Sequence, residues 1–253
     1  MKQLVTYGGL GLLAYAVFLV AQTPADLVVA QARRYLPDLQ VASVQGTILG
    51  GSARALSARN TSLEKIHWRW SPAGLLRGRW EYHVEAREPG MDVSALMGVG
   101  IDGLLTARVV EGEVPFAKAL SVALRRPLPL GGRVVLDLER MQVGLDGLPR
   151  AVEGMARLLD ARTTVGRSLP LGNVAVELTT REEGIFGYVR DSGGPLEVVG
   201  TLTLDPQGRY RFSGQVGLRD QTEEELGKAL PLLLGPPGAD GKYQLKLSGQ
   251  LRV

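Results

Sequence analysis

Strict alternation of apolar and polar residues is the feature that most constrains the fold of this chain. In RWEYHVEAR (Arg79–Arg87), aromatic and aliphatic residues occupy every even position and charged residues or histidine every odd one. Such a period of two places successive side chains on opposite faces of a β-strand. The same period runs through KIHWRW (65–70), RVVLDLER (133–140), NVAVELTTR (173–181) and LEVVGTLTLD (196–205). The chain is therefore predicted to be mainly β, with antiparallel strands that each bury one face.

Two segments break this period and predict short helices. Thr23 and Pro24 are typical of the start of a helix, which is expected to end before Pro37. In TEEELGKALPLLLG (222–235), Thr222 and Glu225 have the spacing of a capping box. We therefore expect two or three short helices beside the sheet.

Two internal repeats predict that similar strands are built twice. GRYRFSGQ (208–215) returns as GKYQLKLSGQ (241–250) with two extra residues, and a two-residue insertion keeps each side chain on its face. Leu247 is then expected to face the core and Lys246 the solvent. LPLGGRVVLDL (128–138) returns as LPLGNVAVEL (169–178) with one residue fewer, which a turn is expected to absorb. Chance reuse of such phrases in an all-β chain is the alternative.

The N-terminal region predicts a membrane anchor. Residues 4–21, LVTYGGLGLLAYAVFLVA, contain no charged residue over a length that can span a bilayer. A cleaved signal peptide is the alternative, but no A-x-A cleavage site follows. We therefore divide the chain into a transmembrane anchor, residues 1–22, and a mainly β domain, residues 23–253. Lys2 on one side and Arg33–Arg34 on the other leave the orientation open by charge counting.

Residues that could perform chemistry are sparse. The chain has no cysteine, and its two histidines, His67 and His83, fall on the charged sides of their strands. Glu81, His83 and Glu85 have a spacing that could ligate a metal, but a solvated strand face is the simpler interpretation. No HExxH, GxSxG, Walker A or strand–GxGxxG motif occurs. We predict a non-enzyme without catalytic, cofactor-binding or metal-ligating residues, in which neither histidine carries function.

The charge distribution argues against nucleic-acid binding. The net charge is +3, and the basic residues are scattered, with no run longer than the pairs Arg33–Arg34 and Arg125–Arg126. A nucleic-acid surface typically needs a clustered basic stripe. Trp68, Trp70 and Trp80 lie close together in the sequence. They are interpreted as core packing, with a hot spot for a partner as the alternative.

Three stretches together resemble a known family. They are G-T-x-x-x-G-x-A (46–53), W-x-W-x-P-x-x-L-L-x-G (68–78) and L-G-x-P-x-x-x-G-x-Y (234–243). In this order, after one hydrophobic segment, they resemble protein N of the bacterial type II secretion system. The resemblance implies an inner-membrane protein with its soluble domain in the periplasm. It also implies a distant similarity to AsmA-like proteins, whose strongly curved antiparallel sheets can hold lipid, and no catalytic residues.

The expected function follows from that resemblance. It is a non-catalytic accessory or assembly component that contacts other type II secretion components in the periplasm. The alternative is a periplasmic lipid-binding or lipid-transfer module of the AsmA-like type. The last strand, residues 243–253, is expected to lie at an open edge of the sheet and to dock a secretion component. Basic residues that merely solubilise a partnerless edge are the competing explanation.

Overall fold

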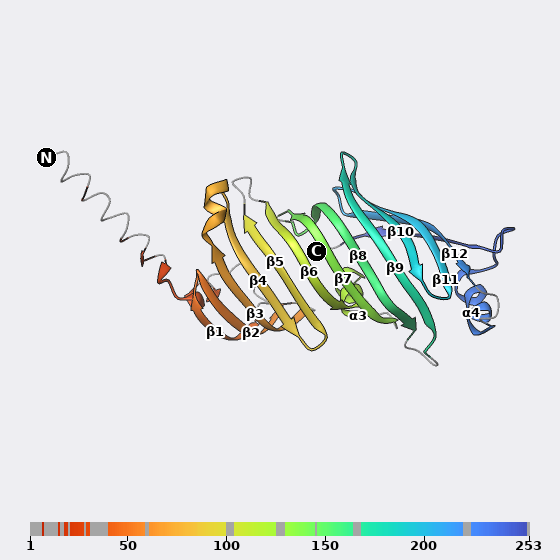
Figure 1. Cartoon of the computed structure of the whole chain (residues 1–253), viewed down its shortest axis with the longest axis horizontal. Helices are drawn as coiled ribbons and strands as arrows, with labels where there is room; N and C mark the ends of the chain where they lie inside the picture. The colour runs from red at the N-terminus through yellow and green to blue at the C-terminus, as the bar shows by residue number, and fades with distance from the viewer. Residues whose placement is uncertain are drawn as a thin grey trace.

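The period-two segments form one antiparallel sheet in which each strand pairs with its neighbours in the sequence. In this computed structural model, the thirteen strands follow one another in the order β1 to β13 (Figure 1). Their bounds are β1 Gln40–Thr47, β2 Gly50–Ala58, β3 Thr61–Ser71, β4 Trp80–Glu88, β5 Met91–Val99, β6 Leu105–Pro115, β7 Leu130–Val143, β8 Pro149–Thr163, β9 Pro170–Arg181, β10 Gly184–Gly193, β11 Leu196–Leu204, β12 Arg209–Leu218 and β13 Tyr243–Gln250. The prediction of a mainly β, antiparallel chain is confirmed.

The structure describes residues 7, 15, 18, 19, 21–27, 29, 30, 40–58, 61–99, 104–124, 130–144, 146–163, 168–219 and 224–251. Most of the predicted anchor and Thr222 of the predicted capping box lie outside this set. Of the helix expected between Thr23 and Pro37, residues 25–27, 29 and 30 are described and are helical. Within the described residues, we find no helix that is both long and apolar enough to cross a membrane.

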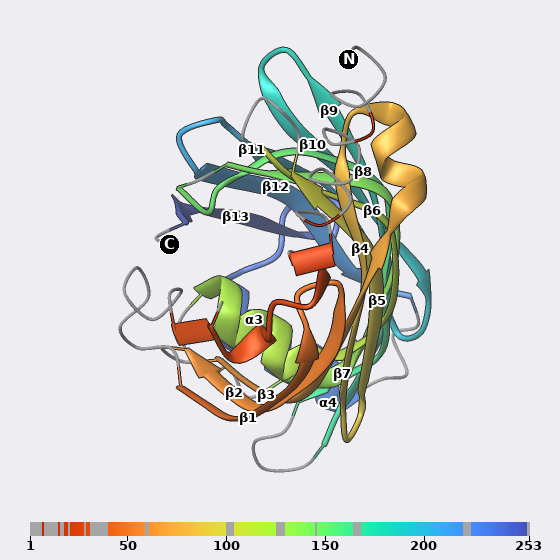
Figure 2. The ribbon, with the colours of Figure 1, turned by 90° about the vertical axis from the view of Figure 1, so that its left-hand side faces the viewer.

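Three short helices accompany the sheet in the part of the chain just defined. They are η1, a 3-10 helix over Pro72–Arg77, α3 over Phe116–Leu124 and α4 over Glu224–Leu234. Figure 2 shows α3 between β1–β3 on one side and β11–β13 on the other, while η1 lies on the opposite face of the sheet. The helix expected at 222–235 is thus formed as α4, with Pro231 inside it.

The apolar face of the alternation carries the core. One cluster, from β6, β7, β8 and β10, contains Val110, Leu138, Val152 and Ile185. A second cluster joins α4 to the last strands: Leu226 and Leu230 of the helix pack with residues of β11, β12 and β13, namely Leu196, Val216 and Tyr243. Burying these side chains is the main favourable term that holds the helices against the sheet.

Irregular residues bend several of the strands. Val109 and Asp160 have positive φ values of 48° and 52° within β6 and β8, which is uncommon for non-glycine residues. The register shifts between Leu138 and Arg140 of β7, so these two residues lie on opposite faces although they are two positions apart. Such β-bulges increase local twist and bend the strand that carries them.

The repeat at 128–138 and 169–178 forms the two strands that flank β8. The prediction that a turn absorbs its deletion is wrong, because the glycine lies inside β7 and the register against β8 shifts between Gly131 and Arg133. Gly132 and its counterpart Gly172 have φ values of +134° and +99°, which favour glycine. A bulge inside the strand, rather than a turn before it, therefore accommodates the difference.

The second repeat forms the adjacent strands β12 and β13, which pair directly. Tyr210 lies opposite Gly249, and a Cβ on Gly249 would be 2.6 Å from the Tyr210 hydroxyl. The glycine of the repeated phrase is therefore required because the aromatic ring of the other copy occupies the space above it.

The expectation that Leu247 is buried is wrong. Its side chain is on the apolar face, as the alternation predicts, but it is 53% exposed. The reason is that α4 packs against the Tyr243 end of β13, and Leu247 lies further along this edge strand. The pattern therefore gives the correct face but not the depth of burial.

Matched leucine-to-alanine substitutions test this distinction. Leu138→Ala removes a side chain that is 5% exposed in the core and should lower the free energy of unfolding by about 2–5 kcal/mol. Leu247→Ala makes the same chemical change at the exposed edge and should cost about 0.5 kcal/mol or less. Urea unfolding followed by circular dichroism measures both. Equal losses of stability would contradict the burial described above.

Candidate interaction surfaces

The two histidines, together with Glu81 and Glu85 of β4, lie along the face of the sheet that carries η1, whereas Glu88 of β4 lies on the other face and pairs with Lys118 of α3. In the β3–β4 register, His67 lies opposite Glu85, and Arg69 lies opposite His83. Among the residues that the structure describes, no three His, Asp or Glu side chains gather closely enough to hold a metal ion. The prediction that neither histidine is functional stays a prediction.

Glu81 corrects the expectation of a uniformly solvated strand face. Its residue exposure is only 2%, because η1 folds back over it: a Cβ on Gly74 would be 2.8 Å from Glu81 Cγ. Arg108 Nη2 donates to Glu81 Oε1 at 2.7 Å from two strands away. Glu81 is therefore buried, whereas His83 is exposed, so Glu81, His83 and Glu85 do not form a row of three equally accessible ligands. The proline and glycines of SPAGLLRG (71–78), between β3 and β4, are the sequence signal that this connection could fold back over the sheet.

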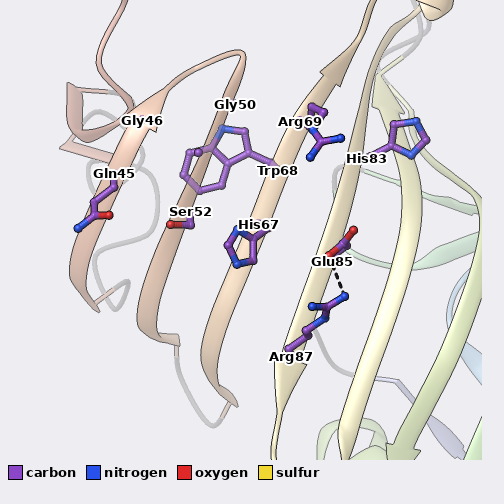
Figure 3. Close-up of a pocket in the computed structure, with 11 residues that line it drawn as sticks. Gln45, Gly46, Gly50, Ser52, His67, Trp68, Arg69, His83, Glu85 and Arg87 are labelled. Atoms are coloured by element: carbon purple, nitrogen blue, oxygen red, sulfur yellow. Dashed lines mark ion pairs between the residues drawn. The ribbon is translucent and has the colours of Figure 1, made fainter.

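An open cavity of about 740 Å³ lies on this face, over β1 to β4 (Figure 3). Its polar lining includes His67, Arg69, His83 and Arg87. The Arg87 guanidinium is paired with Glu85 at 3.2 Å and with Asp92 at 3.5 Å. Such a surface can accept an anionic group from a partner. Ser52 also lines the cavity and lies opposite His67 in the β2–β3 register.

The glycines beside this cavity were not assigned a role from the sequence. A Cβ on Gly51 would be 2.6 Å from Trp68 Cζ2, and the Trp68 indole Nε1 donates to the Thr47 carbonyl at 3.1 Å. The G-T-x-x-x-G stretch and the W-x-W stretch are therefore in contact. Their residues fix the β1–β2 hairpin against β3.

The remaining tryptophans form a pair at the end of β3 and the start of β4. The Trp70 and Trp80 ring centroids are 5.2 Å apart, and Trp80 Nε1 donates to the Tyr82 hydroxyl at 2.8 Å. Trp70 is half-buried, whereas Trp80 is 39% exposed. Core packing therefore accounts for Trp70 and only partly for Trp80.

The open edge of β13 is a second candidate surface. The N–H of Leu251 donates to the Gly208 carbonyl at 2.8 Å, and the neighbouring Gln250 lies opposite Arg209. Because backbone groups alternate in direction along an antiparallel strand, the N–H and C=O of Gln250 point away from β12. By the same alternation, so do those of Lys246 and Ser248. As β13 ends the strand order, the prediction that this strand lies at an edge is confirmed.

A second open cavity, of about 770 Å³, adjoins the same end of β13. It is lined by Ser248, Gly249 and Gln250 together with Asp205 and Arg209 of the β11–β12 hairpin, among others. Although desolvation raises the pKa of Asp205, hydrogen bonds from the Arg209 backbone and guanidinium outweigh it, and this pKa lies below its ordinary value. A fixed anion therefore lies beside the open backbone edge.

Comparison with known proteins identifies the family to which the chain belongs. The sequence model described as "Type II secretion system (T2SS), protein N" matches residues 37–246. The chain belongs to this family. It is therefore a component of the type II secretion system, and the resemblance seen in its motifs is confirmed.

Three relatives, each named "Type II secretion system protein N", are similar over nearly their whole length. The protein from Aeromonas hydrophila is 29% identical, covering 99% of this chain and 100% of the relative. Those from Pectobacterium carotovorum subsp. carotovorum and Vibrio cholerae are 25% and 24% identical, covering 94% and 99% of this chain and 94% and 100% of the relatives. No solved structure matches the chain significantly.

The buried ion pair gives a stability test within this family fold. Arg108→Ala removes the guanidinium that pairs with Glu81, whose side chain is 3% exposed, and should destabilise the fold by about 3 kcal/mol. Arg87→Ala removes exposed pairs only and should cost less than about 1 kcal/mol. The measurement is the urea midpoint at constant m-value. If the Arg108 variant loses as little stability as the Arg87 variant, η1 does not shield Glu81 from solvent.

Proposed function

We propose that the chain is a non-catalytic accessory or assembly component that acts by protein–protein contact in the periplasm. Residues 4–21 hold it in the inner membrane as a single-pass anchor, and residues 23–253 form the periplasmic domain. Family membership supports the secretion role. The absence of cysteine from the sequence, and the lack of any cluster of three His, Asp or Glu among the described residues that could hold a metal, support action without catalysis or a cofactor. The partners are other inner-membrane or periplasmic components of the same system.

The observation that carries this proposal is the unpaired backbone edge of β13. Along one side of this strand, the N–H and C=O groups of alternate residues have no strand to pair with among the described residues. A partner strand added there would gain a ladder of main-chain hydrogen bonds. Lys246, which is exposed, discourages pairing between two copies of this edge. The adjoining cavity with Asp205 and Arg209 offers side-chain contacts that give such a strand its register.

Helices α3 and α4 lie against the apolar face of the sheet, and this favours an assembly component over a lipid-binding module. Leu226 and Leu230 of α4 are buried against β11, β12 and β13. Helix α3 lies near β6 and β7 on the face opposite η1 (Figure 2). We infer a strongly curved, AsmA-like sheet whose hollow side is occupied by these helices. A lipid carrier of that type would instead need an open apolar groove along the same face.

Proline substitution at the edge tests the contact. Gln250→Pro removes one outward-pointing N–H without removing a bond to β12, so the fold should remain while co-purification with the secretion partner and secretion itself decrease severalfold. Gln250→Ala keeps the N–H and is the matched control, which should behave like the parent protein. Both are measured by affinity purification of full-length protein from membranes, with bound proteins and lipids identified.

The outcome separates the two functions. A folded Gln250→Pro protein that secretes and co-purifies normally eliminates this edge as the docking site. Recovery of stoichiometric phospholipid without any secretion component would replace the assembly function with the lipid-binding one.

The anchor is tested independently by N-terminal sequencing of the mature protein. Because residues 4–21 are long for a signal peptide and no cleavage motif follows them, sequencing should begin at or next to Met1. A mature chain that begins near Gln22 would show that the segment is removed.

A further inference from the structure

The point where the chain enters the sheet is tied to the β1–β2 turn. The Thr23 carbonyl accepts a hydrogen bond from the Ile48 N–H at 3.0 Å, and Pro24 forms an isolated antiparallel bridge with Thr47. Ala25, which follows, is buried. The end of the proposed anchor at Ala21 is therefore only two residues from a fixed contact with this turn.

Helix η1 lies at the same end of the sheet. The Trp70 N–H donates to the Leu49 carbonyl of the β1–β2 turn at 2.6 Å, and η1 begins two residues after Trp70, at Pro72. A short series of backbone contacts thus links the anchor exit at Thr23 to the start of η1. The β4–β5 turn lies at the other end of the same strands, as the register from Trp80–Val99 to Glu88–Met91 requires.

Helix η1 exposes two leucines. Leu76 is 91% exposed and Leu75 is 50% exposed. The inner side of the helix is held tightly, since Gly74 packs against Glu81 and the Arg79 N–H donates to the Gly74 carbonyl at 3.0 Å. Two leucines are therefore presented to the surroundings on a short, well-anchored projection.

The flanking residues match the border of a lipid bilayer. Arg77 and Arg79 follow the leucines in the sequence, and Trp80 begins β4 directly after them. Trp80 is partly exposed, with its indole N–H bonded to the Tyr82 hydroxyl. Amphipathic aromatic rings favour the headgroup level of membranes, and basic residues are attracted to anionic phospholipids.

We propose that η1 is a second membrane contact, which inserts Leu75 and Leu76 into the headgroup–acyl boundary of the bilayer in which residues 4–21 are anchored. Anionic phospholipids are the ligand class that the two leucines of η1 fit together with Arg79 and the exposed Trp80, which follow the helix. This proposal rests on the membrane anchorage proposed above. With two attachments, the β1–β4 end of the sheet has a defined orientation to the membrane rather than swivelling on a single helix.

Site-directed spin labelling tests the proposal, and the chain contains no native cysteine to interfere. Leu76→Cys carries a nitroxide in the full-length protein, reconstituted in vesicles of phosphatidylethanolamine and phosphatidylglycerol. Collision with oxygen and with a water-soluble nickel complex gives the depth of the label. Pro89→Cys, at the exposed β4–β5 turn at the far end of the same strands, is the matched control. Ala14→Cys reports the anchor itself.

We expect the Leu76 label about 5–10 Å below the phosphates, the Pro89 label in water and the Ala14 label deep in the bilayer. Ala73→Cys, also exposed on η1, is the second reporter, because Leu76→Cys removes one of the inserting leucines. Labels at 73 and 76 that are as accessible to nickel as the Pro89 label would overturn the proposal.

Two further outcomes assign the cause of a failure. A Leu76 label in water with a buried Ala14 label overturns the η1 contact alone, whereas an Ala14 label in water overturns the proposed anchorage. Shielding of Leu76 only after other secretion components are added would make η1 a protein-docking element, which also overturns the membrane proposal.

Discussion

Backbone hydrogen bonding between consecutive strands is the constraint on which the rest of the structure depends. Each strand satisfies its N–H and C=O groups with the strand before it and the strand after it. A sheet built in this way does not need long crossovers, but it exposes two edges and one long apolar face. The bulges near Val109 and Leu138 bend it, and α3 and α4 lie against the apolar face. The edges remain the places where another chain can add to the ladder.

The features of the fold that could be predicted from the sequence are those that depend on the apolar–polar alternation within each strand. Alternation identified the strands and assigned Leu247 and Glu81 to their correct faces. It could not predict their burial, because burial depends on elements distant along or across the sheet. Helix α4 stops short of Leu247, and η1 folds back over Glu81. Likewise, the bulge at Gly131–Arg133 depends on the partner strand β8, which lies beyond the repeated segment itself. The edge position of β13 follows from the sequential strand order, in which this strand pairs with β12 and ends the sheet.

At two places in the sheet, a glycine is required because an aromatic ring on the neighbouring strand packs over it. At Gly51 the ring is that of Trp68, and at Gly249 it is that of Tyr210. In each case the ring on one strand occupies the volume that a side chain on the neighbouring strand would need. Gly51 and Trp68 belong to two of the stretches that carry the family resemblance, so part of that resemblance reflects a packing requirement.

The sequential strand order also makes the sheet a spacer of definite length. Neighbouring strands lie about 4.8 Å apart, so the twelve intervals from β1 to β13 give a contour of roughly 60 Å. The proposed anchor precedes the first strand in the sequence, and the open edge of β13 belongs to the last. Strand number, rather than loop length, therefore determines how far apart the two edges lie along the sheet. Each added or deleted hairpin would change that separation by about 10 Å without altering either end.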